Sequence, residues 1–343
     1  MASKPGTKAP TITDVARVAG VAASTVSRAL SNPDRVNAAT RERILEAAGS
    51  LHYIPSSQAR ALRSGQKLAI AVLVPDISNP YYFGIIRGTQ LGLKAAGYTQ
   101  LLVDTEESAE SEIASLRKLR SSVDGFVLTA SRLTQDQIDA VAAQSELVVI
   151  NRQIPGVHTV SADTSMGMRQ AMEHLSSLGH RRVAYLSGPA SSWSNAQRWN
   201  AVRTSAKALG MQAFKTMELA PNVESGAAAV DSVLNLSTTA LLAYNDLLAV
   251  GAQLRLQERG LHVPKDFSVV GCDDIQLSKF CSPALTTISA PIEQVGRTAV
   301  GLLLRQLQGE GNAEGGKRHF VLPTHLTIRA SSGSAPSARK GKP

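Results

Sequence analysis

Between residues 67 and 330, short apolar runs alternate with amphipathic stretches, and this alternation restricts the fold more than any other feature of the chain. The run LAIAVLVP at 68–75 is apolar at almost every position, as a strand covered on both faces requires. Intervening stretches such as 81–97 and 167–180 have the apolar spacing of helices. The pattern predicts an α/β fold with doubly wound parallel sheets, with enough units for two lobes. The other predicted strands lie at 99–104, 123–130, 147–151, 182–188, 240–246 and 267–274.

The basic residues are concentrated at the two ends of the chain. Residues 1–66 hold nine Lys and Arg against four Asp and Glu, and residues 331–343 hold three against none, within a net charge of +9. Residues 67–330 are therefore nearly neutral. A small basic domain on a neutral body indicates a polyanionic partner for the small domain.

The length of 343 residues exceeds what one small core needs and predicts two or three domains. Composition divides the chain further into segments. We expect a disordered basic arm at 1–10, a helical domain at 11–54, a polar linker at 55–66, the α/β body at 67–330 and a disordered basic tail at 331–343.

The helical domain has the pattern of three short helices. Thr13 is placed to cap the first, and Gly20 suits a left-handed stop at its C-terminus. A second helix is predicted at about 23–30, and Asn37 is placed to cap a third. A helix, a Gly-containing turn and a second helix at this spacing predict a helix-turn-helix. The residues expected to face inward are Val15, Ala16, Ala19, Val26, Leu30, Ile44, Ala48 and Leu51.

The outward face of the second helix carries Ala23, Ser24, Ser27 and Arg28. Small side chains let a helix approach base edges closely, and Arg28 is able to donate two hydrogen bonds to guanine O6 and N7. Hydroxyl groups and helix N-termini suit phosphates. A solvated helix face with one Arg is the alternative that the spacing alone leaves open.

Motifs along the whole chain resemble those of the lactose-repressor (LacI/GalR) family of bacterial transcription regulators. The resemblance covers residues 11–330 and implies a three-helix helix-turn-helix head, a hinge and a periplasmic-binding-protein-like core of two doubly wound lobes. It places the first lobe at about 67–160 and 291–318 and the second at about 161–290 and 319–330. The motifs, in family order, are TVSRAL, VNAATRERI, LHYIP, SNPYYFGIIRG, LGHRRVAYLSG, AYNDLLAVGA, VVGCDD and PALTTI.

The resemblance assigns DNA contacts to the second helix. Ala23 and Ser24 match the main base-reading positions, Arg28 matches a further base contact, and Thr25 and Ser27 match phosphate contacts. One departure is Ala22, which stands where the family usually has Ser. Losing an N-cap oxygen there costs about 1 kcal/mol.

PSSQARALR matches the family's hinge segment, which is expected to fold as a helix on operator DNA. In that role Ala59 faces the minor groove and Leu62 is an apolar wedge that unstacks a base step and kinks the duplex. Ordinary helix packing is the alternative for Leu62.

In the body, the resemblance implies an effector cleft between the lobes, as the switch-point rule also expects. Its polar side chains are able to grip neighbouring hydroxyls, and its aromatic side chains to cover a sugar face. Two of these residues have an alternative role: Asp273 also fits a turn residue, and Asn245 also fits a helix cap. The implied ligand-binding residues are Asp76, Ser78, Asn79, Tyr81, Tyr82, Phe83, Asn151, Arg152, Asp163, Arg198, Asn245 and Asp273.

Two departures bear on the ligand. Asn151 stands where the family often has Asp, and Thr164 follows Asp163 where Asn is usual. Arg152 and Arg198 together indicate a sugar acid or phosphate as an alternative to a common hexose.

The expected protein is a cytoplasmic homodimeric repressor that binds a palindromic operator and a small effector, a sugar or sugar acid. We expect no cofactor, metal site, membrane segment or enzymatic activity: HExxH and GxSxG are absent, and Cys272 and Cys281 fit reduced thiols. A cytoplasmic sugar-binding protein and a regulator controlled by a protein corepressor are the alternatives.

Overall fold

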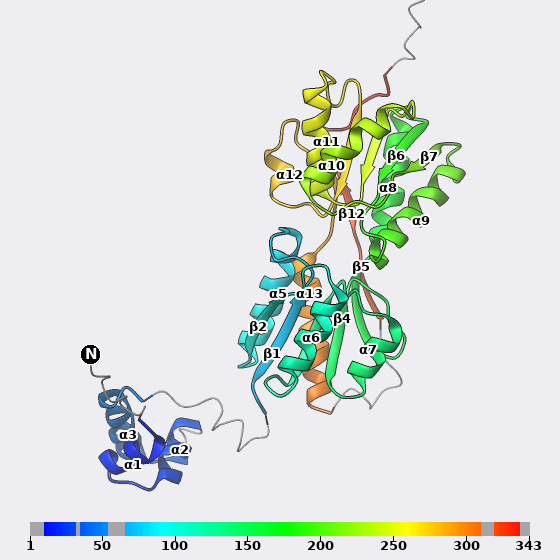
Figure 1. Ribbon diagram of the computed structural model, residues 1–343. Coiled ribbons are helices and arrows are strands. Elements are labelled where there is room, and N and C mark those ends of the chain that lie inside the picture. The colour runs from blue at the N-terminus through cyan, green and yellow to red at the C-terminus, as the bar shows by residue number, and fades with distance from the viewer. Residues whose placement is uncertain (1–9, 32–34, 54–65, 310–318, 337–343) are drawn as a thin grey trace, which may run out of the picture. The chain divides into compact units, whose positions relative to one another are not determined.

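The computed structural model describes residues 10–31, 35–53, 66–309 and 319–336 (Figure 1). The chain divides into two compact units, unit 1 at Met1–Leu68 and unit 2 at Ala69–Pro343. The hinge positions Ala59 and Leu62 lie outside the described residues. No helix within the described ranges is long and apolar enough to cross a membrane.

The described residues of unit 1 form three helices, and the N-cap of the first helix differs from the expectation. Thr11, not Thr13, is the N-cap: it is extended, its hydroxyl accepts from the Asp14 amide, and Asp14 Oδ2 accepts from the Thr11 amide at 2.9 Å. Thr13 fails as a cap because it already lies inside the helix. Gly20, at φ 65°, ends this helix as expected. The helices are α1 (Ile12–Ala19), α2 (Ala23–Ser31) and α3 (Ala38–Ser50).

The core of unit 1 lies where the three helices meet. Val15, Val26 and Ile44 are completely buried, and Leu30 and Leu51 pack against them while partly exposed. The expected inward faces are thus confirmed. The Asn37 side chain accepts from the Ala39 amide at 2.9 Å, which confirms it as the cap of α3.

Unit 2 holds two sheets, each with six strands in the described residues. The first defines lobe 1, and all its strand pairs are parallel. In spatial order its strands are β11 (His319–Leu322), β5 (His158–Ala162), β4 (Glu146–Ile150), β3 (Gly125–Thr129), β1 (Ala69–Val74) and β2 (Thr99–Asp104).

The second sheet defines lobe 2 and is parallel except at one edge, where its last strand pairs antiparallel. All seven strands predicted from apolar runs are present in the two sheets. In spatial order the strands of lobe 2 are β12 (His325–Thr327), β10 (Thr286–Ser289), β9 (Ser268–Cys272), β8 (Ala240–Ala243), β6 (Arg182–Leu186) and β7 (Gln212–Lys215).

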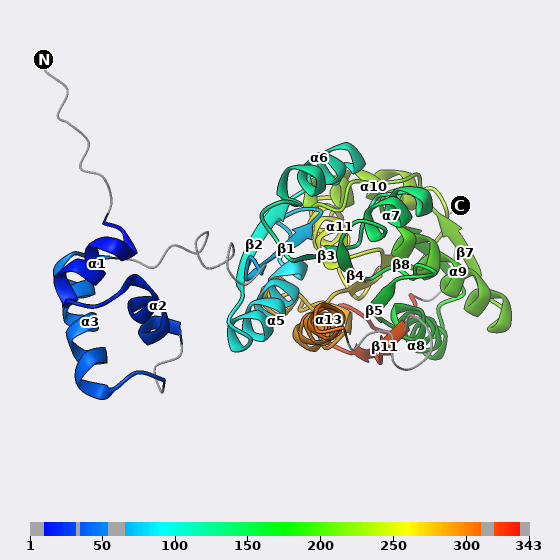
Figure 2. The ribbon, with the colours of Figure 1, turned by 90° about the horizontal axis from the view of Figure 1, so that it is seen from below.

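Helices cover both faces of the lobe 1 sheet (Figure 2). α5 (Tyr81–Ala95) and α13 (Ile292–Leu307) pack together on one face, while α6 (Ala109–Leu119) and α7 (Gln135–Ala142) cover the other. Along β1, Val72 and Val74 contribute to the α5–α13 side and Leu73 to the α6–α7 side, so this strand is apolar throughout. Close approach of α5 and α13 requires Gly88, because a Cβ there would lie 2.1 Å from the Glu293 carbonyl oxygen.

Lobe 2 is built in the same way around one large apolar core, at whose centre Tyr185 is fully buried. α8 packs on α9, and α10 packs on α11. The helices of this lobe are α8 (Thr164–Ser177), α9 (Trp193–Ala208), α10 (Val223–Leu234), α11 (Asp246–Glu258) and α12 (Leu277–Phe280).

Two expected boundaries are wrong. Residues 319–330 were expected in lobe 2, yet β11 joins lobe 1, because His319 and the residues after it pair in parallel with β5. β5 itself runs across the expected boundary at residue 160. Of the two strands within 319–330, only β12 belongs to lobe 2.

The expected disorder of the C-terminal tail is also wrong for residues 331–336. Ser331 is fully buried: its hydroxyl donates to the Val269 carbonyl and accepts from the Thr286 amide at 2.8 Å. The Ala335 amide donates to the Leu178 carbonyl. The polar composition of this segment did not indicate its order, because hydrogen bonds attach it to lobe 2 and apolar burial does not. Residues 337–343 lie outside the described residues.

Candidate functional site

The first candidate surface is the outward face of α2 in unit 1. Ser24 and Arg28 are exposed, and Ala23, Thr25 and Ser27 are partly exposed. Val26 and Ala29, on the other face, are buried in the core of the unit. The face is thus made of small side chains with one long cation, a shape that is able to lie close to a groove floor.

The start of α2 depends on backbone alone. The Thr25 and Val26 amides donate to the Ala22 carbonyl, so Ala22 occupies the N-cap position. An alanine has no side-chain oxygen to accept a further amide hydrogen. The loss of N-cap stabilisation expected from Ala22 in the sequence therefore applies to α2.

The second candidate site surrounds Arg198 on α9, in unit 2. Its Nη2 lies 3.4 Å from Asp273 Oδ1, its Nη1 donates to the Tyr244 carbonyl, and its guanidinium carbon lies 4.7 Å from the centre of the Tyr244 ring. Arg198 is 5% exposed and Asp273 6%. Within the described residues, Arg198 Nε is buried without a hydrogen-bond partner.

Lobe 1 contributes a second pair of polar groups to this site. Asn151 Nδ2 donates to the Tyr81 hydroxyl at 2.6 Å, and both side chains are buried. Asn151 follows β4 with a positive φ of 58°, a backbone conformation that Asn tolerates better than most residues. Ser194 Oγ on α9 donates to the Asn151 carbonyl at 3.2 Å and so links the lobes. We call Tyr81, Asn151, Arg198, Tyr244 and Asp273 the Arg198 cluster.

The carboxyls in and beside the Arg198 cluster titrate far from their ordinary range. Burial raises the pKa of Asp273 to about 7 against the opposing charge of Arg198. Burial, and next the charge of Asp273, raise the pKa of the neighbouring Asp246 to about 8. Asp246 accepts from the Ile275 amide at 2.9 Å and from the Thr287 hydroxyl at 2.5 Å. Perturbed carboxyls of this kind are common at functional sites.

Two expected ligand residues serve as helix caps. Asn245 Oδ1 accepts from the Leu248 amide at 3.0 Å, and its Nδ2 donates to the Pro221 carbonyl. Asp163 Oδ1 accepts from the Met166 amide at 2.9 Å. For Asn245 the capping alternative drawn from the sequence is what is observed.

Other expected ligand residues have local partners or face solvent. Asp76 Oδ1 accepts from the Ser78 amide and hydroxyl, and Asn79 Oδ1 accepts from the Tyr81 amide. Arg152 donates to the carbonyls of Ser131 and Leu133.

The two aromatic residues that follow Tyr81 differ in exposure. Tyr82 is buried, which raises the pKa of its hydroxyl, and the nearby Tyr244 raises that pKa further. Phe83 is 55% exposed. Tyr82 therefore lies beside the Arg198 cluster, whereas Phe83 faces solvent.

Sequence reasoning missed Tyr244 and its partner Ser192. The Tyr244 hydroxyl lies 3.1 Å from Ser192 Oγ, and the Ser192 side chain also caps α9. Tyr244 directly follows β8 and precedes Asn245. Its position at the end of a parallel strand was the sequence signal that could have identified it.

Of the two tryptophans, Trp199 has a packing role, since its ring stacks on that of Tyr185 with 5.7 Å between the ring centres.

A cavity of about 450 Å³ lies beside the Arg198 cluster and has walls from both lobes. Trp193 is the neighbour of Ser194 along α9, and Gln153 follows Arg152, so the cavity adjoins the link between the lobes. Its lining residues are Gln153, Ile154, Pro155, Gly156, Val157, Thr159, Trp193, Gln197 and His319.

Two families match the chain. Residues 11–56 match bacterial regulatory proteins of the lacI family, and residues 172–332 match a periplasmic binding protein-like domain. The first match covers the three helices of unit 1.

Curated relatives match over almost their full length. The HTH-type transcriptional repressor CytR of Escherichia coli K12 is 32% identical over 98% of this chain and 100% of its own length. The HTH-type transcriptional repressor PurR of Aliivibrio fischeri MJ11 is 30% identical over 94% and 98%.

Solved structures match in the same way. A lac repressor dimer bound to operator and the anti-inducer ONPF has a TM-score of 0.86 at 30% identity, over 95% of this chain and all of its own. The regulator CelR in complex with cellobiose has a TM-score of 0.70 at 29% identity, over 94% and 99%. A regulator from Enterococcus faecium with bound ribose has a TM-score of 0.69 at 28% identity, over 77% and 98%.

Proposed function

The chain belongs to the lacI family of bacterial regulatory proteins, and on that premise we propose that it is a transcription repressor whose affinity for operator DNA is set by a small effector bound in unit 2. The observation that carries the proposal is the outward face of α2, with small side chains around Arg28 on a basic three-helix unit. The protein is expected to bind DNA and an effector reversibly and not to act as an enzyme.

For DNA recognition, α2 enters the major groove. Ala23 and Ser24 approach the base edges, and Arg28 donates to a guanine. Thr25 and Ser27 hold phosphates and fix the position of the helix on the duplex. In the hinge, Ala59 faces the minor groove and Leu62 acts as the wedge, a role that rests on the resemblance to the family.

For effector binding, the Arg198 cluster is the site of specificity. Paired donors and acceptors from Arg198, Asp273 and Asn151 suit neighbouring hydroxyl groups, and Tyr81 and Tyr82 supply aromatic surface. Arg198 already has Asp273 and the Tyr244 carbonyl as partners, and Arg152 is held by backbone carbonyls, so a neutral sugar fits better than a sugar acid. Relatives bound to cellobiose and to ribose support this class of ligand.

The repressor acts as a homodimer on a palindromic operator. Phe83 and Leu91 on α5 are 55% and 41% exposed, and Leu102 on the edge strand β2 is 37% exposed. An apolar surface of this kind favours contact with a second copy. The dimer of the lac repressor on its operator supports the same assembly. Since the operator is bacterial chromosomal DNA, the protein works in the cytoplasm.

DNA binding is tested by fluorescence anisotropy of the full chain on labelled duplexes at several salt concentrations. The logarithm of the affinity should fall against the logarithm of salt with a slope of about −0.9 per phosphate contacted. Lys207→Ala, which removes an exposed charge from lobe 2, should leave affinity unchanged. Affinity that does not respond to salt would exclude a phosphate-binding interface.

Effector binding is tested by a thermal-shift screen of sugars, sugar acids and nucleosides, since a ligand that binds only the folded chain raises its midpoint. A hit should be lost in Arg198→Ala, which should still bind DNA. A hit that survives this change would remove Arg198 from the site. A screen without any hit, with DNA binding intact, would favour a protein corepressor.

A further inference from the structure

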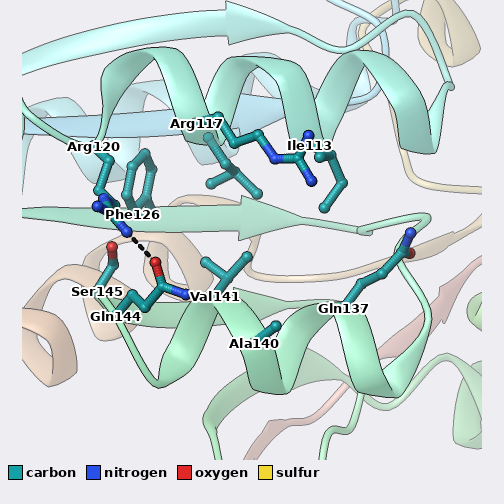
Figure 3. A pocket seen from close by; sticks show the side chains of 10 residues that line it. Ile113, Arg117, Arg120, Phe126, Gln137, Ala140, Val141, Gln144 and Ser145 are labelled. Atoms are coloured by element: carbon teal, nitrogen blue, oxygen red, sulfur yellow. Dashed lines mark hydrogen bonds between the residues drawn. The ribbon is translucent and has the colours of Figure 1, made fainter.

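A second cavity lies in lobe 1, between α6 and α7, and we call it the α6–α7 groove (Figure 3). Its volume is about 470 Å³, and it continues into a smaller hollow of about 280 Å³ through the shared residues Ile113, Arg117 and Gln137. A volume of this size suits a small organic ligand. Neither hollow is lined by a member of the Arg198 cluster.

The walls of the α6–α7 groove are largely apolar. Leu116 and Phe126, 3% and 1% exposed, form its floor at the start of β3, and Ile113, Ala140 and Val141 line its sides. Figure 3 shows side chains of the two helices facing one another across the strand. A flat apolar molecule placed here removes its own surface and that of these walls from water.

The charges of the α6–α7 groove are unevenly distributed. Arg117 on α6 and Arg120, which directly follows α6, line the main cavity with their guanidinium groups directed toward opposite ends of it (Figure 3), and Arg120 donates to Gln144 Oε1 across the groove. The one carboxylate among the described lining residues is Glu110, in the smaller hollow. Guanidinium groups bind carboxylates through charge-assisted hydrogen bonds, so an anion is favoured beside Arg117, since Arg120 already donates to Gln144.

The α6–α7 groove is connected to the interlobe side of lobe 1 through α6. On the same helix, Glu112 is buried and accepts from the Arg132 amide at 3.0 Å. Arg132 in turn donates from Nε to Glu107 at 2.7 Å and lies near Tyr82 and Tyr244. A ligand that displaces α6 therefore acts on groups that adjoin the Arg198 cluster.

We propose that the α6–α7 groove is a second ligand site, separate from the Arg198 cluster, for a small organic anion with a flat apolar body such as an aromatic carboxylate. The ring lies over Phe126 and Leu116, and the carboxylate is held by Arg117. Binding at this site does not depend on the proposed DNA-binding function.

The site is tested by calorimetric titration of the full chain with 2-naphthoate and with 2-naphthalenemethanol, its neutral analogue. Naphthoate should bind about tenfold more tightly than the alcohol, since its carboxylate makes charge-assisted hydrogen bonds. Arg117→Gln should remove most of that difference, while Lys118→Gln, which removes an exposed charge from the next position of α6, should preserve it.

Location is tested with two further variants. Ala140→Phe fills the α6–α7 groove from an exposed position of α7 and should abolish naphthoate binding, whereas Ala142→Phe, outside the lining, should not. Equal binding of acid and alcohol, no binding of naphthoate, or binding that survives Ala140→Phe but is lost in Arg198→Ala would each overturn the proposal. Wild-type sugar and DNA binding in Ala140→Phe would show that the variant is folded.

Discussion

Arg28 is the long cation on a helix face otherwise made of small side chains, and its exposure leaves its guanidinium available to a partner. We expect Arg28→Ala to relax discrimination at one base pair by about 1–3 kcal/mol, because a bidentate contact to guanine is lost. The measurement is competition binding against operators changed at single base pairs. An equal loss on all sequences would instead assign Arg28 to a phosphate.

Asp246 links stability to pH. The folded chain keeps its proton up to about pH 8, whereas an unfolded carboxyl releases it near 4. The folded state thus binds more protons in this window, so the free energy of unfolding falls as pH rises from about 4 to about 8. The Asp246→Asn variant has no such proton, so its free energy of unfolding should fall less between about pH 4 and about pH 8 than that of the wild type. Urea unfolding at several pH values measures this fall.

The control for this prediction is Asp139→Asn, which changes an exposed carboxylate on α7 and should keep the wild-type decline. A decline in Asp246→Asn as steep as that of the wild type would place the titrating group elsewhere.

At single positions, the sequence identified polar residues near the site, but it did not show which of them face the site. Arg198 and Asp273 were both named, and they meet at 3.4 Å. Asn245 and Asp163 were named with them, yet both cap helices. The reason is physical: a polar residue at the end of a parallel strand is also the residue that begins the next helix, so the two roles share one position.

Among the elements, α2 begins without a side-chain cap, since Ala22 offers only its carbonyl. Ala22→Ser should add an N-cap acceptor for the Ser24 or Thr25 amide and stabilise the helix by about 1 kcal/mol. Hydrogen exchange of the α2 amides measures the effect. Exchange as fast as in the wild type would mean that the first turn is not limiting.

Most of the predicted strands, β1, β3, β4 and β9 among them, are buried apolar runs, but burial alone does not separate them from the missed strands. β2 was predicted although it is an edge strand without a fully buried residue, whereas β5 (HTVSA) and β10 (TTIS) were missed although they are buried interior strands, because their sequences are polar. Of the other missed strands, β7 and β12 lie at sheet edges with partly exposed residues, and β11 is an edge strand of four residues. Such strands depend on a neighbour's hydrogen bonds, which are not visible in local composition.

At the scale of the whole molecule, the proposed dimer depends on exposed apolar residues of α5. Phe83→Glu should shift the chain toward monomer and weaken operator binding, since one head alone reads one half-site. Sedimentation at several concentrations measures the shift. Met217→Glu, at a loop position 82% exposed, is the matched control. Unchanged dimerisation in Phe83→Glu would place the interface elsewhere.

The division of the body into two lobes was predicted, but the point at which the chain crosses from one lobe to the other near residue 323 was not. β11 and β12 are separated by two residues yet belong to different sheets. Nothing local marks that crossing, because each strand is specified by its partner: β11 by β5, and β12 by β10. Tertiary pairing of this kind lies beyond a single sequence.

The proposed function requires unit 1 to read a palindromic DNA sequence through α2. The most direct test is selection of duplexes from a random library by the full chain, followed by sequencing. We expect an enriched palindrome, with one symmetric base pair in each half-site that loses its preference in Arg28→Ala. No enrichment, or an enriched sequence that Arg28→Ala selects equally well, would contradict it.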